Sequence, residues 1–250
     1  MTTPTATPFD AVERLERAAP GDPDDAVIWR AVRDNAAEMS RPALSYDLFL
    51  MLALLAAIAV TEDSSILVVG AMVVGPEFAA VGAVCVGPVF REWGLAWRSA
   101  RLLAFGFAFA ILAVTLLALL ALLGRATGLV TAELVTRPRP LTGFIWQPDR
   151  WSFIVAVVDG TAGVLALATE RTTTKVGVFI SVTTVPAAGN LALGLATWQG
   201  HEIGGSPAQL LLNLCGMVLA GALFLLFQRA AWPWLMRRTA RLFGVAEPRA

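Results

Sequence analysis

Six apolar runs set the strongest constraint on how this chain of 250 residues folds. They occupy residues 44–60, 66–90, 102–124, 151–169, 176–198 and 208–228. A helix that crosses the roughly 30 Å hydrocarbon core of a bilayer needs about 20 apolar residues. One or two such runs also occur as core helices of soluble proteins, but six leave too little polar surface to cover them. The sequence therefore predicts an all-α polytopic membrane protein with six transmembrane helices.

The composition supports this class of protein. Apolar residues make up 57% of the chain, charged residues 15%, and the mean hydropathy is +0.68. An ordinary soluble domain has about 45–50% apolar and about 25% charged residues. The 19 basic and 19 acidic residues cancel, so charge does not indicate a nucleic acid. We expect the lipid bilayer as a partner and no nucleic acid.

The distribution of basic residues predicts the orientation. Most of them flank the apolar runs on the side of both termini, whereas Arg125, Arg137, Arg139 and Arg150 fall on the opposite side. Because cytoplasmic loops carry the excess of Lys and Arg, both termini are expected in the cytoplasm. We predict cytoplasmic amphipathic helices in residues 1–41, a domain of the inner membrane in 42–229, and a basic cytoplasmic tail in 230–250.

The two halves of the membrane domain resemble each other. In residues 44–124 and again in 151–228, a first run is followed by a polar hairpin, a second run containing Pro76 or Pro186, and a third run. Three runs per half predict that the halves are inverted, and inverted repeats with interrupted helices mark transport sites near the midplane. Proline frees backbone groups, which lipid tolerates only when protein or water covers them. The alternative is that each proline merely kinks a packed helix.

Two acidic residues inside the runs are the main candidates for function. Glu77 follows Pro76 directly, and Asp159 lies in the middle of the fourth run. A charge at mid-membrane costs at least about 2.5–3.5 kcal/mol, so such residues usually face a cavity or a partner. We predict that Glu77 and Asp159 bind an ion or a protonatable solute. Alternatively, Glu77 favours the dipole of a new half-helix that begins at Pro76, and Asp159 bonds across a helix interface.

Uncharged polar residues extend the predicted site. Ser181, Thr183, Thr184 and Asn190 surround Pro186, and Asn213 is the strong polar group of the last run. They either line a solute path or serve packing, because Ser and Thr often bond to their own helix and Asn joins helices.

The charges of the first hairpin also have two interpretations. Glu62 and Asp63 either gate one mouth of a path or are solvated turn charges. Asp63 is also a candidate cap for the helix that follows it.

No constellation for catalysis, a cofactor or a metal is found. His201 is the single histidine, and Cys85 and Cys215 lie within apolar runs, where cysteine acts as a small hydrophobe. We expect a transporter or channel for a small solute or cation rather than an enzyme. The alternative is a membrane scaffold or sensor that acts through oligomerisation and a partner. A homodimer is expected in either case, because twofold association is the commonest.

Three stretches resemble one family of hydrophobic membrane proteins, described as domain of unknown function 389. Residues 61–82, TEDSSILVVGAMVVGPEFAAVG, are similar to its signature of a polar turn, Gly-Ala-Met and a proline. Residues 163–190 and 209–216 are similar to its second and third blocks. Where many relatives have Pro-Leu-Met and Pro-Pro, this chain has Pro76-Glu77-Phe78 and a single Pro186, which resembles an actinobacterial-type branch without the extra soluble domain of some relatives. The resemblance implies the fold rather than a substrate.

Overall fold

The structure is a computed structural model that describes residues 45–73, 77–123, 137–168 and 184–243, together with 131 and 133. These residues form seven α-helices, one 3-10 turn and no strand, so the all-α prediction is confirmed for them. The predicted N-terminal helices, Pro76, Ser181 and Thr183 lie outside the described residues. The helices are α3 (Ser45–Thr61), α4 (Ser65–Val73), α5 (Glu77–Phe90), α6 (Trp93–Leu123), α8 (Arg150–Ala168), α10 (Thr184–Thr197) and α11 (Gly200–Phe243), and the 3-10 turn is η2 (Gly143–Trp146).

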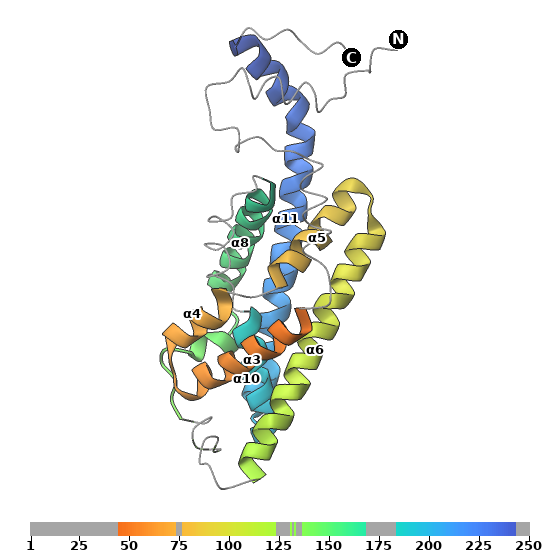
Figure 1. Ribbon diagram of the computed structural model, residues 1–250. Coiled ribbons are helices and arrows are strands. Elements are labelled where there is room, and N and C mark those ends of the chain that lie inside the picture. The colour runs from red at the N-terminus through yellow and green to blue at the C-terminus, as the bar shows by residue number, and fades with distance from the viewer. Residues whose placement is uncertain are drawn as a thin grey trace.

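Within the described residues, two helices are long and apolar enough to cross a membrane, namely α6 and the segment Gly200–Ala231 of α11. α6 has 31 residues and α11 has 44. At 1.5 Å per residue they are about 46 Å and about 66 Å long, more than a bilayer core requires. Both run lengthwise through the molecule (Figure 1).

The boundaries of these two helices correct the predicted loops. α6 begins nine residues before the predicted third run, and α11 contains residues 200–207, between the fifth and sixth predicted runs, as well as the predicted tail as far as Phe243. The exposed Arg98 explains the first difference, because a long basic side chain on a solvated face does not interrupt a helix. Hydropathy therefore marked the apolar middle of each helix but not its ends.

The other predicted runs correspond to shorter helices. α3 has 17 residues and α8 has 19, whereas the second run is divided into α4, with 9 residues, and α5, with 14. The fifth run is described from Thr184 onward, as the 14 residues of α10. Proline accompanies both starts, because Pro76 directly precedes α5 and Pro186 is the third residue of α10. Proline suits these positions, since the first turn of a helix has no intrahelical partner for its N–H groups.

Small residues let the helices pack closely. A Cβ atom at Gly160 of α8 would lie 2.4 Å from the carbonyl oxygen of Met217 in α11, and one at Gly189 of α10 would lie 2.8 Å from that of Ala53 in α3. The core around these crossings is rich in alanine and valine. Packing of this kind favours association of helices in lipid, where the hydrophobic effect between helices is absent.

One helix–turn–helix unit occurs twice, in α5–α6 and in α10–α11. α5 and α10 each have 14 residues, and Glu77 and Thr184, their first residues, are 107 positions apart. Both helices end in a left-handed residue, Arg91 with φ 61° and Trp198 with φ 57°.

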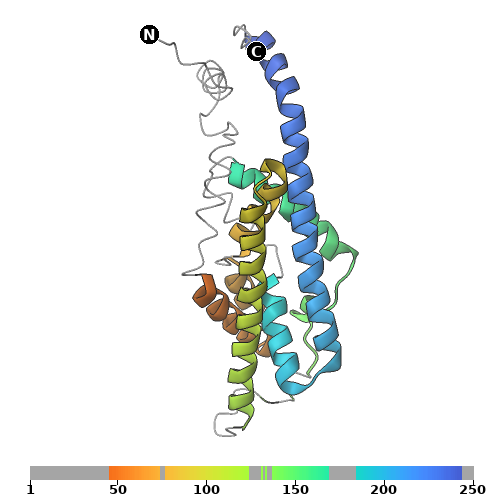
Figure 2. The same cartoon turned by 90° about the vertical axis from the view of Figure 1, so that its right-hand side faces the viewer.

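The hydrogen bonds of the two turns also correspond. The N–H of Glu92 donates to Gly87 O at 2.9 Å, and the N–H of Gln199 donates to Gly194 O at 2.9 Å. This is the 6→1 bond of a Schellman cap. The two turns lie at opposite ends of the molecule (Figure 2).

Candidate functional site

The first residues of α5 and α10 meet in the interior. The Thr184 hydroxyl donates a hydrogen bond to Glu77 Oε1 at 2.9 Å. Glu77 is 4% exposed and Thr184 is fully buried. The spacing of 107 residues between the bonded partners equals the spacing between the two helix–turn–helix units. Equivalent positions of the two units therefore touch each other.

The second carboxylate oxygen of Glu77 differs from the first. Glu77 Oε2 is buried and accepts no hydrogen bond from any residue that the structure describes. Glu77 is also the first residue of α5, where the alternative interpretation of its role had placed it, so its charge interacts favourably with the helix dipole. Among the described residues, the carboxylate thus lies at the start of α5 with the start of α10 bonded to it, has no ion pair with a basic side chain, and retains acceptor capacity.

The other predicted residues do not all join Glu77. Asp159 is buried on α8, next to the Gly160 that packs on α11. Pro186 is buried two residues after Thr184. Asn213, buried on α11, accepts a hydrogen bond from Gln209 at 3.4 Å, one turn earlier on the same helix.

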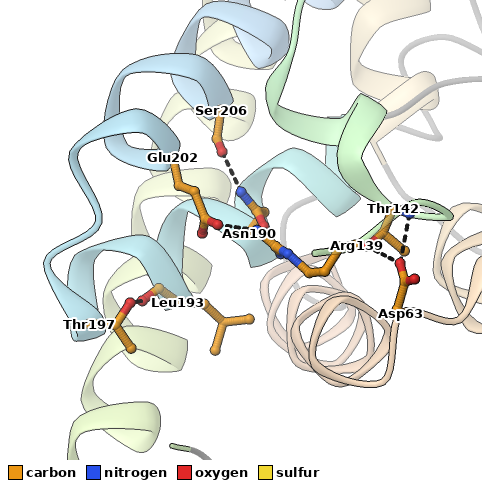
Figure 3. A network of polar contacts seen from close by, with 8 residues as sticks. All are labelled: Asp63, Arg139, Thr142, Asn190, Leu193, Thr197, Glu202 and Ser206. Atoms are coloured by element: carbon orange, nitrogen blue, oxygen red, sulfur yellow. Dashed lines mark hydrogen bonds and ion pairs between the residues drawn. The ribbon is translucent and has the colours of Figure 1, made fainter. Parts of the chain in front are cut away.

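Asn190 belongs to a second buried polar cluster, which the sequence did not reveal. Its Oδ1 accepts a hydrogen bond from Arg139 Nη1 at 2.8 Å, and its Nδ2 donates to Ser206 Oγ at 2.8 Å. Arg139 also forms an ion pair with Glu202 (Figure 3). These four residues are each at most 8% exposed. We call Arg139, Asn190, Glu202 and Ser206 the arginine cluster.

The arginine cluster attaches the connection between the two halves of the chain. Arg139 comes from the loop before η2, whereas Asn190 lies on α10 and Glu202 in the first turn of α11. A Cβ atom at Gly205 of α11 would lie 1.9 Å from the carbonyl oxygen of Trp146, so glycine is required where η2 meets α11. The loop is thus held to the domain through the buried side chain of Arg139, although residues 137, 138, 140 and 141 are exposed.

A second set of contacts fixes the same loop to the α3–α4 turn. Asp63 Oδ1 accepts hydrogen bonds from the N–H and the hydroxyl of Thr142 at 2.9 Å and 2.8 Å (Figure 3). Arg137 donates to the Thr61 carbonyl. Asp63 has φ 49°, and Ser64 caps α4 by accepting from the N–H of Leu67 at 3.4 Å. The predicted cap at Asp63 is therefore wrong, because Asp63 bonds to the loop instead.

Burial and neighbouring acidic residues have opposite effects on the pKa of Arg139, and the net effect is a lowered pKa. Burial lowers the pKa of the Arg139 guanidinium, and the negative charges of Glu202 and Asp63 raise it. Removing one partner of a buried ion pair leaves an uncompensated charge that is strongly destabilising. The prediction of membrane orientation from basic residues included Arg139 as an ordinary loop charge. The one available signal was its position between two prolines, Pro138 and Pro140, because such a stretch is extended.

The matching register of the two units corrects the predicted pairing of prolines. With a spacing of 107 residues, Pro186 corresponds to Ala79 and not to Pro76. Gly82 and Gly189 keep the common spacing. The two units thus share the positions of their first residues, these glycines and their turns, but not the position of a proline.

A family model described as a domain of unknown function (DUF389) matches residues 72–219, which is more than half of the chain. The matched segment includes Glu77, Asp159, Thr184 and the whole arginine cluster. No curated protein and no solved structure matches the chain.

Proposed function

The chain belongs to the family described as domain of unknown function 389, and from that premise we propose that it is a multi-pass transporter or channel for a small solute or ion. In this proposal α3 to α6, with α4 and α5 counted as one interrupted helix, and α8 to α11 are two inverted three-helix repeats. The substrate site lies where α5 and α10 begin. The observation that carries the proposal is the hydrogen bond between Glu77 and Thr184, the matched first residues of two short buried helices.

The symmetry of this contact supports an inverted repeat. When equivalent residues of two repeats touch each other, the twofold axis that relates the repeats passes between them. The positions of the α5–α6 and α10–α11 turns at opposite ends of the molecule agree with such an axis (Figure 2). Sites of secondary transporters lie at this kind of repeat interface, built from the ends of discontinuous helices.

The loop contacts support the proposed orientation. The α3–α4 turn, the loop before η2 and the start of α11 are joined by the bonds of Asp63 and Arg139. They therefore share one side of the molecule, which we assign to the outside of the inner membrane. Both termini and the α5–α6 turn are then cytoplasmic, as the distribution of basic residues predicts.

A membrane scaffold is the second candidate function, and close packing favours it. Gly189 and Gly160 bring helix backbones into direct contact, as a dry interior requires. A groove of about 480 Å³ on the surface is lined by Tyr46, Phe105 and neighbouring residues of α6 and does not include Glu77. A scaffold would use such faces to bind a second copy or a partner.

Flux through reconstituted vesicles separates the two candidates. Full-length protein in liposomes is compared with Glu77→Gln and with Glu62→Gln, which makes the same change at an exposed turn residue. Solute and ion movement is followed across a range of pH with entrapped pH- and ion-sensitive dyes. We expect flux in the parent and in Glu62→Gln, and an altered rate or pH dependence in Glu77→Gln. Vesicles that conduct nothing, although the protein is folded, would favour the scaffold.

A further inference from the structure

We propose that the crossing of α5 and α10 binds one small monovalent anion together with one proton, the proton on Glu77 and the anion at the two helix starts. This inference rests on the proposed function, because it names the substrate class of the same site. It reverses the expectation of a cation that the acidic residues alone suggest.

Backbone groups of two helices provide the anion ligands. The first four N–H groups of an α-helix have no partner within their own helix. α5 begins at Glu77 and α10 begins at Thr184, and the hydrogen bond between these two residues brings both helix starts together. Pro186 lacks an N–H, so the N–H donors at the start of α10 come from the other residues of its first turn. Free N–H groups at a helix start are a common anion-binding arrangement, and the side-chain bond between Glu77 and Thr184 places two such starts next to each other.

The charges at this crossing balance only while Glu77 is ionised. Each helix start is equivalent to about +0.5 elementary charge, so two of them together contribute about +1. An ionised Glu77 supplies one negative charge, and its side chain is almost completely buried. A cation would then enter a neutral site that already faces two positive helix ends. Protonation of Glu77 instead leaves about one positive charge for a monovalent anion.

The carboxylate has room for the proton. Glu77 Oε1 accepts from Thr184, while Oε2 accepts nothing from the described residues. A proton on Oε2 therefore leaves the Thr184 contact intact. It adds a donor that can itself bond to the incoming anion.

Other charged groups on the surrounding helices either bond elsewhere or oppose the binding of an anion. Arg229 donates to the Val89 carbonyl at the far end of α5, and Glu202 is paired with Arg139. α10 carries no titratable residue. Asp159 on α8 is buried, and when ionised it disfavours an anion nearby. Among the side chains that the structure describes on the helices packed around α5 and α10, the remaining charged or basic groups are Asp47, Arg98, Arg101, Arg150 and His201, all exposed.

The test measures chloride binding and proton uptake separately. Sodium chloride, and sodium nitrate in a parallel experiment, is titrated into the purified full chain in sodium gluconate at about pH 5 and about pH 8. Calorimetry reads anion binding, and a pH indicator in weak buffer reads proton uptake. Both probes are anions of strong acids, so binding of an undissociated acid does not contribute. The variants are Glu77→Gln, Asp159→Asn and the surface control Glu62→Gln.

The expected pattern is specific to Glu77. In the parent, chloride binds more weakly at higher pH, by up to about tenfold per pH unit, and takes up about one proton. Glu77→Gln, a permanently neutral mimic, binds chloride with the same affinity at both pH values and takes up no proton. Asp159→Asn binds chloride more tightly and keeps the proton uptake. Glu62→Gln behaves as the parent does.

Several outcomes would overturn the inference. These are no anion binding in either the parent or Glu77→Gln at low pH, unchanged pH dependence in Glu77→Gln, or sodium binding in the parent that Glu77→Gln abolishes. Vesicle flux separates the two proposals: chloride flux without proton coupling defeats this inference but leaves the transporter standing. Proton-coupled chloride binding without any flux would leave this inference standing and defeat the transporter.

Discussion

Two buried polar regions of this molecule are built in opposite ways. In the arginine cluster a guanidinium contacts a carboxylate and an amide from two different helices, so positive and negative charges face each other directly. At the crossing of α5 and α10, the Glu77 carboxylate has one hydroxyl donor from Thr184 and no basic side chain among its described contacts. The first region fixes a loop in place. In the second region one carboxylate oxygen of Glu77 remains available to accept a hydrogen bond, as a binding site requires.

The same substitution in the two regions gives the sharpest test of this contrast. Glu202→Gln leaves Arg139 buried without its counter-charge, and we expect a loss of about 3–5 kcal/mol in the free energy of unfolding. Glu77→Gln removes a buried charge that only helix dipoles compensate in the described contacts, so we expect a smaller loss, of at most about 2 kcal/mol. Thermal unfolding in detergent, with chemical denaturation in lipid–detergent micelles, measures both. Equal losses would erase the distinction between the two regions.

Two consecutive glycines of α11 test whether η2 must contact this helix. Gly205→Ala would place a methyl group 1.9 Å from the Trp146 carbonyl oxygen, whereas Gly204→Ala meets nothing within 4 Å. We expect Gly205→Ala to lower the free energy of unfolding by about 1–3 kcal/mol through overpacking. Gly204→Ala should leave it unchanged or raise it slightly. Proteolysis of the loop before η2, followed over time, reports whether the loop has separated.

A smaller effect is expected where the same loop meets the α3–α4 turn. Asp63→Ala removes the acceptor for the N–H and the hydroxyl of Thr142, and we expect a loss of about 1–2 kcal/mol in stability. Glu62→Ala, one residue earlier and exposed, is the matched control. If the control loses as much stability as Asp63→Ala, the helix end rather than the loop contact accounts for the loss.

The smallest effect concerns the start of α8. Asp149 accepts hydrogen bonds from the N–H and the hydroxyl of Ser152 at 2.7 Å and 2.8 Å, and these bonds lower the pKa of Asp149. A carboxyl whose folded pKa lies below its unfolded value stabilises the fold above the unfolded pKa. That contribution is lost as the pH falls through the folded pKa. The protection of amides in the first turn of α8, measured as the exchange rate relative to the intrinsic rate at each pH, should therefore fall in acid for the parent and not for Asp149→Ala.

Several features of the fold follow from local sequence. The apolar runs place helices correctly because burial of apolar side chains and backbone pairing act over a few turns. The alternative interpretation of Glu77, in which a half-helix begins at Pro76 with Glu77 in its first turn, agrees with the position of Glu77 as the first residue of α5. Helix ends were missed at Trp93 and Gly200, because polar residues extend a helix without changing its hydropathy signal. Arg139 was missed because a loop arginine is normally solvated, and its partners lie 51 and 63 residues further along the chain.

The sequence by itself determined that this is an apolar, helical member of its family with acidic residues in unusual places. Only the tertiary structure decided what surrounds those acids. The starts of α5 and α10 are 107 residues apart in the sequence. They meet because α5 packs on α6 and α11 while α10 packs on α3 and α6. A helix dipole is a property of a folded helix and its direction, and no residue type encodes it. The sign of the field at Glu77 therefore depends on packing, whereas the presence of its carboxylate depends on sequence alone.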